Sequence, residues 1–208
     1  KMIYIIDYGL GNLEAFYNIY KRLNIEIKFA KNCDDLVDVE KIILPGVGAF
    51  DHAMKLLNNS GMRDKLDQLV LVDKIPVIGI CVGMQILGKS SEEGKLDGLG
   101  WIEGVVKKFD MSSIEYHTKL PHMGWNNINI LQNNPLFKNL DSDALFYFLH
   151  SYYFECDDKN EILAQSQYGN YFSCVINRRN IYGVQFHPEK SHQYGITLLN
   201  NFTNLNNA

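Results

Sequence analysis

One cysteine of the chain has neighbours that suit a nucleophile. Cys81 is the central residue of GICVG (79–83), between the apolar run IPVIGI and a second apolar run. A cysteine that only packs needs no flanking glycines, whereas a nucleophile on a tight strand-to-helix turn needs them because neighbouring backbone passes close by. The start of the helix favours the thiolate, and the N–H of Val82 points to where an oxyanion would form. The pattern predicts a catalytic thiol, with a buried cysteine in a glycine-rich turn as the alternative.

A thiol nucleophile needs a base, and the base needs a group that orients it. Among six histidines, His187 ends the apolar run of IYGVQFHPEKS (181–191), and Glu189 follows two residues later. Positions i and i+2 of an extended chain share a face, so Glu189 is expected to fix the tautomer of His187. The other ring nitrogen would then face Cys81. A chance histidine and glutamate at a strand end is the alternative for this pair taken alone.

The segment LPGVGA (44–49) ends another apolar run. Its two glycines, Gly46 and Gly48, expose backbone N–H groups, which suit the second half of an oxyanion hole. Ligands of open α/β sheets collect at the carboxyl ends of parallel strands, so this segment is expected at the same sheet edge as Cys81.

The elements that must position these residues follow an alternating pattern in the first half of the chain. Strands are expected at 2–7, 25–30, 41–46 and 75–80, and helices at 13–24, 49–74 (interrupted near Ser60) and 82–90. Strands that are apolar on both faces and alternate with helices predict a mostly parallel sheet covered on both sides.

The second half is richer in closely spaced strands. Strands are expected at 105–109, 126–131, 145–156, 162–168, 172–177 and 181–187, and a final helix at 197–205. We therefore expect one α/β domain over residues 1–208, with an antiparallel extension of the sheet.

Composition excludes several classes of function. The chain has 208 residues, 46% of them hydrophobic, and a net charge of −4, which gives no footprint for nucleic acid or an anionic membrane. No stretch approaches the roughly 18 apolar residues of a membrane-spanning helix, and Asp7 comes too early for a signal peptide. The other three cysteines, Cys33, Cys156 and Cys174, are expected to be inert. The wide spacing of all four cysteines predicts no metal site and no disulfide framework, and so a cytoplasmic protein.

Three motifs taken together carry a family resemblance. GICVGMQIL, LPGVGAF and YGVQFHPEKS resemble the class I, triad-type glutamine amidotransferases. DYGLGNL, LPHMGWN and FLHSYYF, in order along nearly the whole chain, narrow the resemblance to the glutaminase subunits of imidazole glycerol phosphate synthases. The resemblance implies a flavodoxin-like α/β fold, in agreement with the pattern of elements.

The resemblance also implies roles for named residues. Cys81, His187 and Glu189 would form the catalytic triad, and the oxyanion would be held at Val82, Val47 and Gly48. Glutamine would be bound by Gly46, Gln85, Ser151 and Tyr152. A (β/α)8 cyclase subunit would dock as the heterodimer partner at Trp125, Asn126 and Lys190 and receive the ammonia. No cofactor and no metal are implied.

Other functions remain open from the residues alone. A paralogous glutaminase could feed a different synthase, such as an enzyme that amidinates surface sugars. A stand-alone cysteine hydrolase and a non-catalytic binding module are two further alternatives. Release of glutamate that depends on a partner separates the two glutaminase readings, the synthase subunit and its paralogue, from the stand-alone hydrolase and the binding module.

Overall fold

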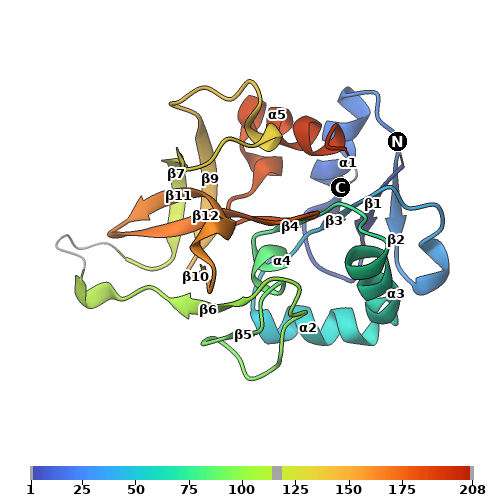
Figure 1. Ribbon diagram of the computed structural model, residues 1–208, viewed down its shortest axis with the longest axis horizontal. Helices are drawn as coiled ribbons and strands as arrows, with labels where there is room; N and C mark the ends of the chain where they lie inside the picture. The colour runs from blue at the N-terminus through green and yellow to red at the C-terminus, as the bar shows by residue number, and fades with distance from the viewer. Residues whose placement is uncertain (1, 114–118, 207–208) are drawn as a thin grey trace.

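Two sheets hold the strands of the protein, for which a computed structural model describes residues 2–113 and 119–206 (Figure 1). The large sheet contains β1 (Ile3–Ile6), β2 (Ile27–Ala30), β3 (Lys41–Leu44), β4 (Val77–Ile80), β5 (Ser90–Ser91), β6 (Gly104–Lys108), β8 (Asn129–Ile130), β10 (Tyr152–Cys156), β11 (Ile162–Tyr168), β12 (Asn170–Arg178) and β13 (Ile181–Val184). The small sheet pairs β7 (His122–Asn127) with β9 (Leu145–His150).

The large sheet is parallel in one half and mostly antiparallel in the other. Its order is β2-β1-β3-β4-β13-β12-β10-β6-β5, with β11 paired to β12 and β8. The first five strands run parallel, whereas β12 is antiparallel to both β13 and β10, and β10 is antiparallel to β6. The predicted architecture, a mostly parallel sheet with an antiparallel extension, is confirmed.

Helices cover both faces of the parallel half. They are α1 (Leu13–Arg22), α2 (Phe50–Asn59), α3 (Arg63–Asp67), which continues into a π-helical turn (Gln68–Val72), α4 (Val82–Gln85) and α5 (His192–Thr203). Figure 1 shows α1 and α5 on one face and α2 and α3 on the other. In α1 the Asn12 side chain caps the helix by accepting from Ala15 N–H, and the buried face carries Phe16, Ile19 and Tyr20 at helical spacing.

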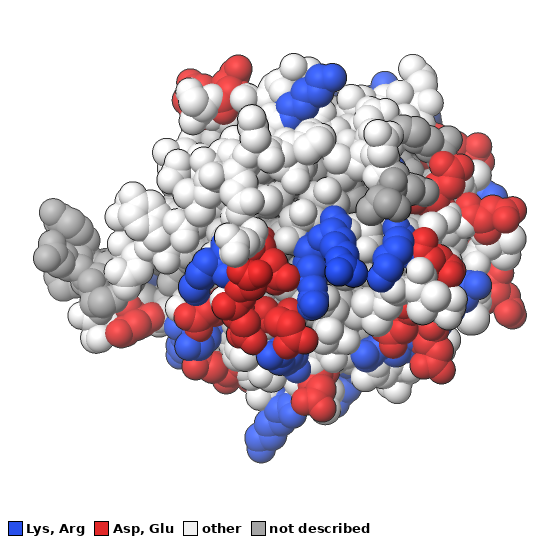
Figure 2. All heavy atoms as spheres, in the orientation of Figure 1, with Lys and Arg blue, Asp and Glu red and all other residues white. Residues whose placement is uncertain are grey.

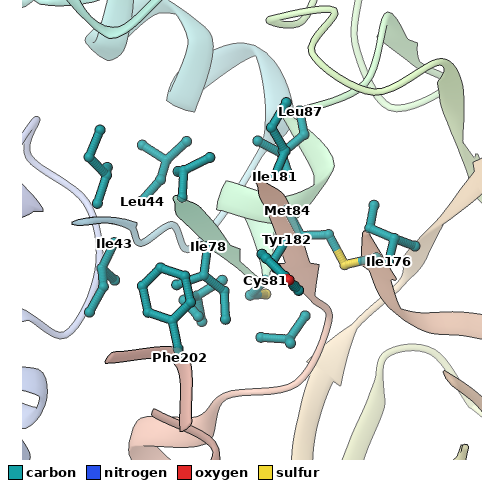
Figure 3. Close-up of a cluster of buried hydrophobic side chains, with 14 of the residues drawn as sticks. Ile43, Leu44, Ile78, Cys81, Met84, Leu87, Ile176, Ile181, Tyr182 and Phe202 are labelled. Carbon is teal, nitrogen blue, oxygen red and sulfur yellow. The ribbon is translucent and has the colours of Figure 1, made fainter. Parts of the chain in front are cut away.

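The core lies beneath the residues that could do chemistry. Strands β1, β3, β4 and β13 are buried along their whole length, as expected for parallel strands covered on two sides. Figure 3 shows residues of β3, β4, β13, α4 and α5 meeting in one apolar cluster, with Cys81 at the end of β4. Packing from several elements therefore fixes the position of this cysteine.

Charged side chains are mixed rather than segregated. On the face drawn in Figure 2, acidic and basic residues lie close together, without a large region of one sign. Within residues 2–113 and 119–206, none of the helices combines the length and the apolar character needed to cross a membrane.

Several boundaries differ from the sequence predictions around the site. The helix expected at 82–90 ends at Gln85. Gly88 lies beyond it, packed so closely on Phe154 that an added Cβ would lie 2.8 Å from the ring. The strand expected at 145–156 is two strands in different sheets, β9 and β10, which are separated by Ser151.

The remaining differences lie in the second half. The strand expected at 126–131 is instead β7, which begins at His122, and the short β8. The strand expected at 181–187 leaves its ladder after Val184, so His187 lies beyond the last paired residue. The last helix begins at His192, earlier than predicted, and packs tightly on the turn before it, since a Cβ on Gly195 would clash with the Pro188 carbonyl.

Candidate active site

Cys81 lies on a sharp turn between β4 and α4. Its backbone has φ 54° and ψ −111°, a conformation that L-residues rarely adopt. Its N–H donates to the Val184 carbonyl at 2.8 Å, which joins the ends of the adjacent strands β4 and β13. A strained strand-to-helix turn of this kind presents a side chain at the sheet edge, as in a nucleophile elbow.

The flanking glycines are required by close backbone packing. A Cβ on Gly79 would clash with the Gly83 carbonyl, and a Cβ on Gly83 would clash with the Leu44 carbonyl. A Cβ on Gly46 would lie 2.6 Å from the Gly83 nitrogen. The ends of β3 and β4 therefore meet through glycine backbone, which brings the Gly46–Gly48 segment close to Cys81.

His187 reaches the same edge from β13, the strand next to β4. Ile80 and Val184 are paired in the parallel ladder, so Cys81 and His187 both lie just past the carboxyl ends of neighbouring strands. His187 Nδ1 is 2.7 Å from Glu189 Oε1, and both side chains are buried. The backbone N–H of His187 donates to the Tyr147 carbonyl at 2.8 Å, which ties this histidine to β9.

The contact between His187 and Glu189 forms in a different way from the predicted one. Glu189 lies in a 3₁₀ turn (Pro188–Lys190) rather than in extended chain, so the i, i+2 argument was wrong although the two side chains do meet. Burial opposes the charged imidazole, but hydrogen bonds and charges from Cys81 and Glu189 outweigh it and raise the pKa of His187 to about 10. This arrangement favours a positively charged His187 beside the sulfur.

A pocket of about 480 Å³ opens above this sheet edge. It is lined by Val47, Gly48, Ala49, Cys81, Val82, Gln85, Glu93, Pro121, Leu149, His150, Ser151, Tyr152, His187 and Lys190. Of the residues predicted to bind or react, Gly46 lies beneath the pocket against Gly83, and Glu189 lies behind His187.

A buried tyrosine holds the loop that follows β3. The Tyr8 hydroxyl donates to the Pro45 carbonyl at 2.5 Å, and burial raises the pKa of Tyr8, which keeps this phenol protonated as a donor. Gly48 has φ +86°, a left-handed backbone conformation that glycine adopts without strain, and no atom lies within 4 Å of an added Cβ. Val47, Gly48 and Val82 line the same pocket.

Gln85 uses its amide nitrogen within the protein. Nε2 donates to the Tyr152 carbonyl and to Gln185 Oε1, both at 3.2 Å, and the side chain is buried. Its two N–H bonds are therefore taken, and its carbonyl oxygen is the group left to accept from a ligand.

Gln185 and Glu93 are among the residues at the site that escaped the sequence analysis. Gln185 is fully buried, and its Nε2 donates to Cys81 Sγ at 3.8 Å. The signal was available, because a glutamine inside the apolar run IYGVQFH needs a buried partner. Glu93 lines the pocket from the loop before β6, and nothing in its local sequence marks it.

The predicted docking residues do not all lie on one face. Trp125 is 47% exposed and stacks on His192, with ring centroids 5.0 Å apart. Lys190 Nζ lies 5.9 Å from the centre of the Tyr147 ring, next to Trp125. The Asn126 side chain points to the other face of β7, where it donates to the Gln167 carbonyl at 2.8 Å.

Comparison with known proteins places the chain in a family. The family model "Glutamine amidotransferase class-I" matches residues 4–205. The chain is 56% identical over 205 residues to the imidazole glycerol phosphate synthase subunit HisH of Bdellovibrio bacteriovorus, covering 98% of this chain and 100% of the relative. It is 52% identical over 204 residues to the protein of the same name from Leptospira borgpetersenii, with the same coverage.

Solved structures agree on the fold. A crystal structure of a glutamine amidotransferase aligns with a TM-score of 0.73 at 18% identity, covering 97% of this chain and 98% of that one. PurLQS from Thermotoga maritima aligns with a TM-score of 0.73 at 16% identity, covering 98% and 97%. The strand order, the glycine-supported cysteine turn and the full-length sequence matches lead to one conclusion: the chain belongs to the class I glutamine amidotransferases.

Proposed function

We propose that the protein is the glutaminase subunit of an imidazole glycerol phosphate synthase, which hydrolyses glutamine and passes the ammonia to a (β/α)8 cyclase subunit. The observation that carries the proposal is the meeting of Cys81 with the His187–Glu189 pair above adjacent strands, in a pocket of about 480 Å³. Full-length relatives named as subunits of this synthase support the choice of pathway.

In the proposed reaction, His187 holds the proton of Cys81, and the thiolate attacks the side-chain carbonyl carbon of glutamine. The oxyanion that forms is stabilised by the N–H of Val82 and by the loop at Val47 and Gly48. His187 then gives its proton to the leaving nitrogen, and ammonia departs as the tetrahedral intermediate collapses to a glutamyl thioester. Water, activated by His187, attacks the thioester to release glutamate and restore the thiol.

The other end of glutamine is a charged amino acid, and the pocket offers groups of complementary chemistry. The Gln85 carbonyl oxygen and the Glu93 carboxylate suit the α-ammonium group. Ser151 and Tyr152, where the chain crosses from β9 to β10, suit the α-carboxylate through their main-chain N–H groups.

The partner would dock on the exposed face of the small sheet, the docking face, formed by Met123, Trp125, Leu145, Tyr147 and Leu149. Met123 is 65% exposed, Leu145 44% and Leu149 36%, which leaves an apolar surface on a two-stranded ribbon. Leu149 also lines the pocket, and its carbonyl is 3.8 Å from Cys81 Sγ. Ammonia released at Cys81 would therefore leave beside the docked subunit, with little exposure to water.

Truncating the docking face should weaken the complex. Trp125→Ala is expected to raise the Kd for the cyclase subunit by about 10- to 100-fold, because large aromatic side chains at the centre of an interface carry much of the binding energy. The measurement is isothermal titration calorimetry with the purified cyclase subunit.

A matched leucine pair controls for general destabilisation. Leu145 lies on the docking face and Leu71 lies at the end of the π-helical turn, with 44% and 41% of their surfaces exposed. Leu145→Ala should weaken binding and Leu71→Ala should not. Equal Kd values for the two variants would show that the partner docks elsewhere.

The proposed function is tested by assay of glutamate release from glutamine, with and without the cyclase subunit and its ligand. Stimulation that depends on the partner supports the proposal, and strong activity of the free chain, or turnover of peptides, contradicts it. Complementation of a histidine auxotroph, with the cognate cyclase present, separates this protein from a paralogue. Failure to complement by protein that is expressed and folded would assign the ammonia to a different synthase.

A further inference from the structure

Two buried histidines lie between the docking face and the pocket. His122 of β7 and His150 of β9 are directly opposite each other in the small sheet, and both are buried. Residues alternate along a strand, so Met123 and Trp125 face outward while His122 and Asn126 face inward. The docking face and the histidine pair are therefore opposite sides of the same two strands.

The hydrogen-bond partners allow only one arrangement of the pair. His150 Nδ1 lies 2.8 Å from the Tyr152 carbonyl, which can only accept, so Nδ1 carries the hydrogen. Burial lowers the pKa of His150 to about 3 and that of His122 to about 4, so both rings are neutral at neutral pH. His150 Nε2 is then an acceptor, and His122 Nδ1, 2.9 Å away, is its donor.

These hydrogen bonds form a series, and the bond at its outer end, from Asn126 to His122, has the same donor-to-acceptor direction. Asn126 Nδ2 donates to the Gln167 carbonyl at 2.8 Å, which identifies it as the amide nitrogen, and it also lies 3.3 Å from His122 Nε2. The ring of His122 is stacked between Phe148 and Tyr168, with centroids 4.9 Å and 4.2 Å away. Ring orientation and tautomer are thus both fixed.

The inner end reaches the residues proposed to hold glutamine. The Tyr152 carbonyl accepts from His150 on one side and from Gln85 on the other. Gln85 also donates to Gln185, and Gln185 donates to the sulfur of Cys81. Because the Tyr152 carbonyl only accepts, no proton can pass along this series of hydrogen bonds. The series can therefore act only by fixing the positions of its members.

We infer that His122 and His150 are positioning residues, which hold the Tyr152 main chain and Gln85 in place for glutamine and tie them to the strands of the docking face. The inference rests on the proposed function, and it adds that the glutamine site depends on one hydrogen bond between two neutral imidazoles. A slip of one residue between β7 and β9 would break that bond, since it would turn every side chain of the strand to the other face.

The test compares two substitutions of His122 in the complex with the cyclase subunit. Asparagine can place an amide N–H where Nδ1 lies, whereas leucine has a similar size and no donor. His122→Leu is expected to raise the KM for glutamine about tenfold, with kcat changed less than about threefold, because a buried acceptor loses its donor. His122→Asn should keep the KM within about threefold of wild type.

A packing control separates this effect from a loosened core. The Phe172 ring contacts both imidazole rings, with its centroid 5.7 Å from that of His122 and 5.1 Å from that of His150, but it takes no part in the series of hydrogen bonds. Phe172→Leu should leave the KM near that of wild type. An unchanged KM in His122→Leu, or an equal rise in all three variants, would overturn the inference.

Two further measurements keep the outcomes distinct. Ammonia-dependent synthesis by the same complexes should be unchanged, which shows that the cyclase subunit is intact; a parallel loss would overturn the positioning role. In wild-type protein at neutral pH, long-range ¹H–¹⁵N spectra should show both rings neutral with hydrogen on Nδ1, and any other state overturns the inference even if a variant fails to fold. A wild-type complex that releases no glutamate would instead overturn the proposed function itself.

Discussion

Cys81→Ala is expected to abolish glutamine-dependent synthesis by the complex and to leave ammonia-dependent synthesis intact. Without the sulfur no thioester can form, so glutamate release should fall by on the order of 10⁴-fold or more, as when the nucleophile of a catalytic triad is removed. The cyclase subunit supplies its own chemistry and needs only ammonia. Product formation is measured with glutamine and, separately, with ammonium salts at alkaline pH.

The other cysteines provide controls for this variant. Cys33 is exposed and Cys174 is fully buried, and neither lines the pocket. Cys33→Ala should behave as wild type, and Cys174→Ala should lose stability while keeping glutaminase activity per folded molecule. Glutamate release that persists in Cys81→Ala would show that a different group attacks glutamine.

Gly83→Ala should destabilise the fold and remove activity, although it adds only one methyl group. The new Cβ is attached directly to the main chain of α4 and would clash with the Leu44 carbonyl, a main-chain group, so relief requires β3 and α4 to move apart. Overpacking of this kind costs about 3 kcal/mol, which corresponds to a fall in Tm of roughly 6–12 °C for a chain of this size. The same displacement would separate the Gly46–Gly48 segment from Cys81, so glutaminase activity should be lost as well. Thermal unfolding and glutamate release are the measurements.

Gly61→Ala is the matched control for that substitution. Gly61 has φ +74° in the turn after α2, and no atom lies within 4 Å of an added Cβ. Only the cost of a left-handed backbone, about 1–2 kcal/mol, is expected, together with normal glutaminase activity. Equal losses of Tm and activity in Gly61→Ala and Gly83→Ala would show that the contact between the ends of β3 and β4 does not determine the geometry of the site.

The parallel half of the sheet was predictable from the sequence for a simple physical reason. Strands buried on both faces are mostly apolar, so β1, β4 and the part of β3 after Lys41 stand out as apolar runs. The glycines beside Cys81 could be interpreted in the same way, since two close backbone approaches leave no room for Cβ atoms. Local rules therefore identified the tight turn that carries Cys81.

The small sheet was harder to predict, because its sequence pattern of apolar and polar residues does not follow the usual rule of apolar residues inside and polar residues outside. In β7 the outward residues Met123 and Trp125 are apolar and the inward residues His122 and Asn126 are polar, the reverse of an ordinary half-buried strand. The break at Ser151 was also hidden, since β9 and β10 are both apolar and only tertiary pairing places them in different sheets. The residues with inverted polarity are those assigned here to docking and positioning.

Glu93 shows a different limit of sequence reasoning. It reaches the pocket from the loop before β6, and its Oε2 accepts from the Phe50 N–H at 3.3 Å, at the start of α2. That contact joins residues far apart along the chain, and an exposed glutamate has no periodic signal to mark it. Only the assembled fold indicates that this carboxylate can meet a substrate ammonium group.

The activation of Cys81 by His187 is tested most directly by covalent labelling with a diazoketone analogue of glutamine, followed by peptide mass mapping. In the complex, the label should attach to Cys81 and not to the exposed Cys33, glutamine should slow the reaction, and His187→Gln should suppress it strongly. Label on Cys33 in preference to Cys81, or labelling of Cys81 that is indifferent to the loss of His187, would contradict the assignment of this pair as nucleophile and base.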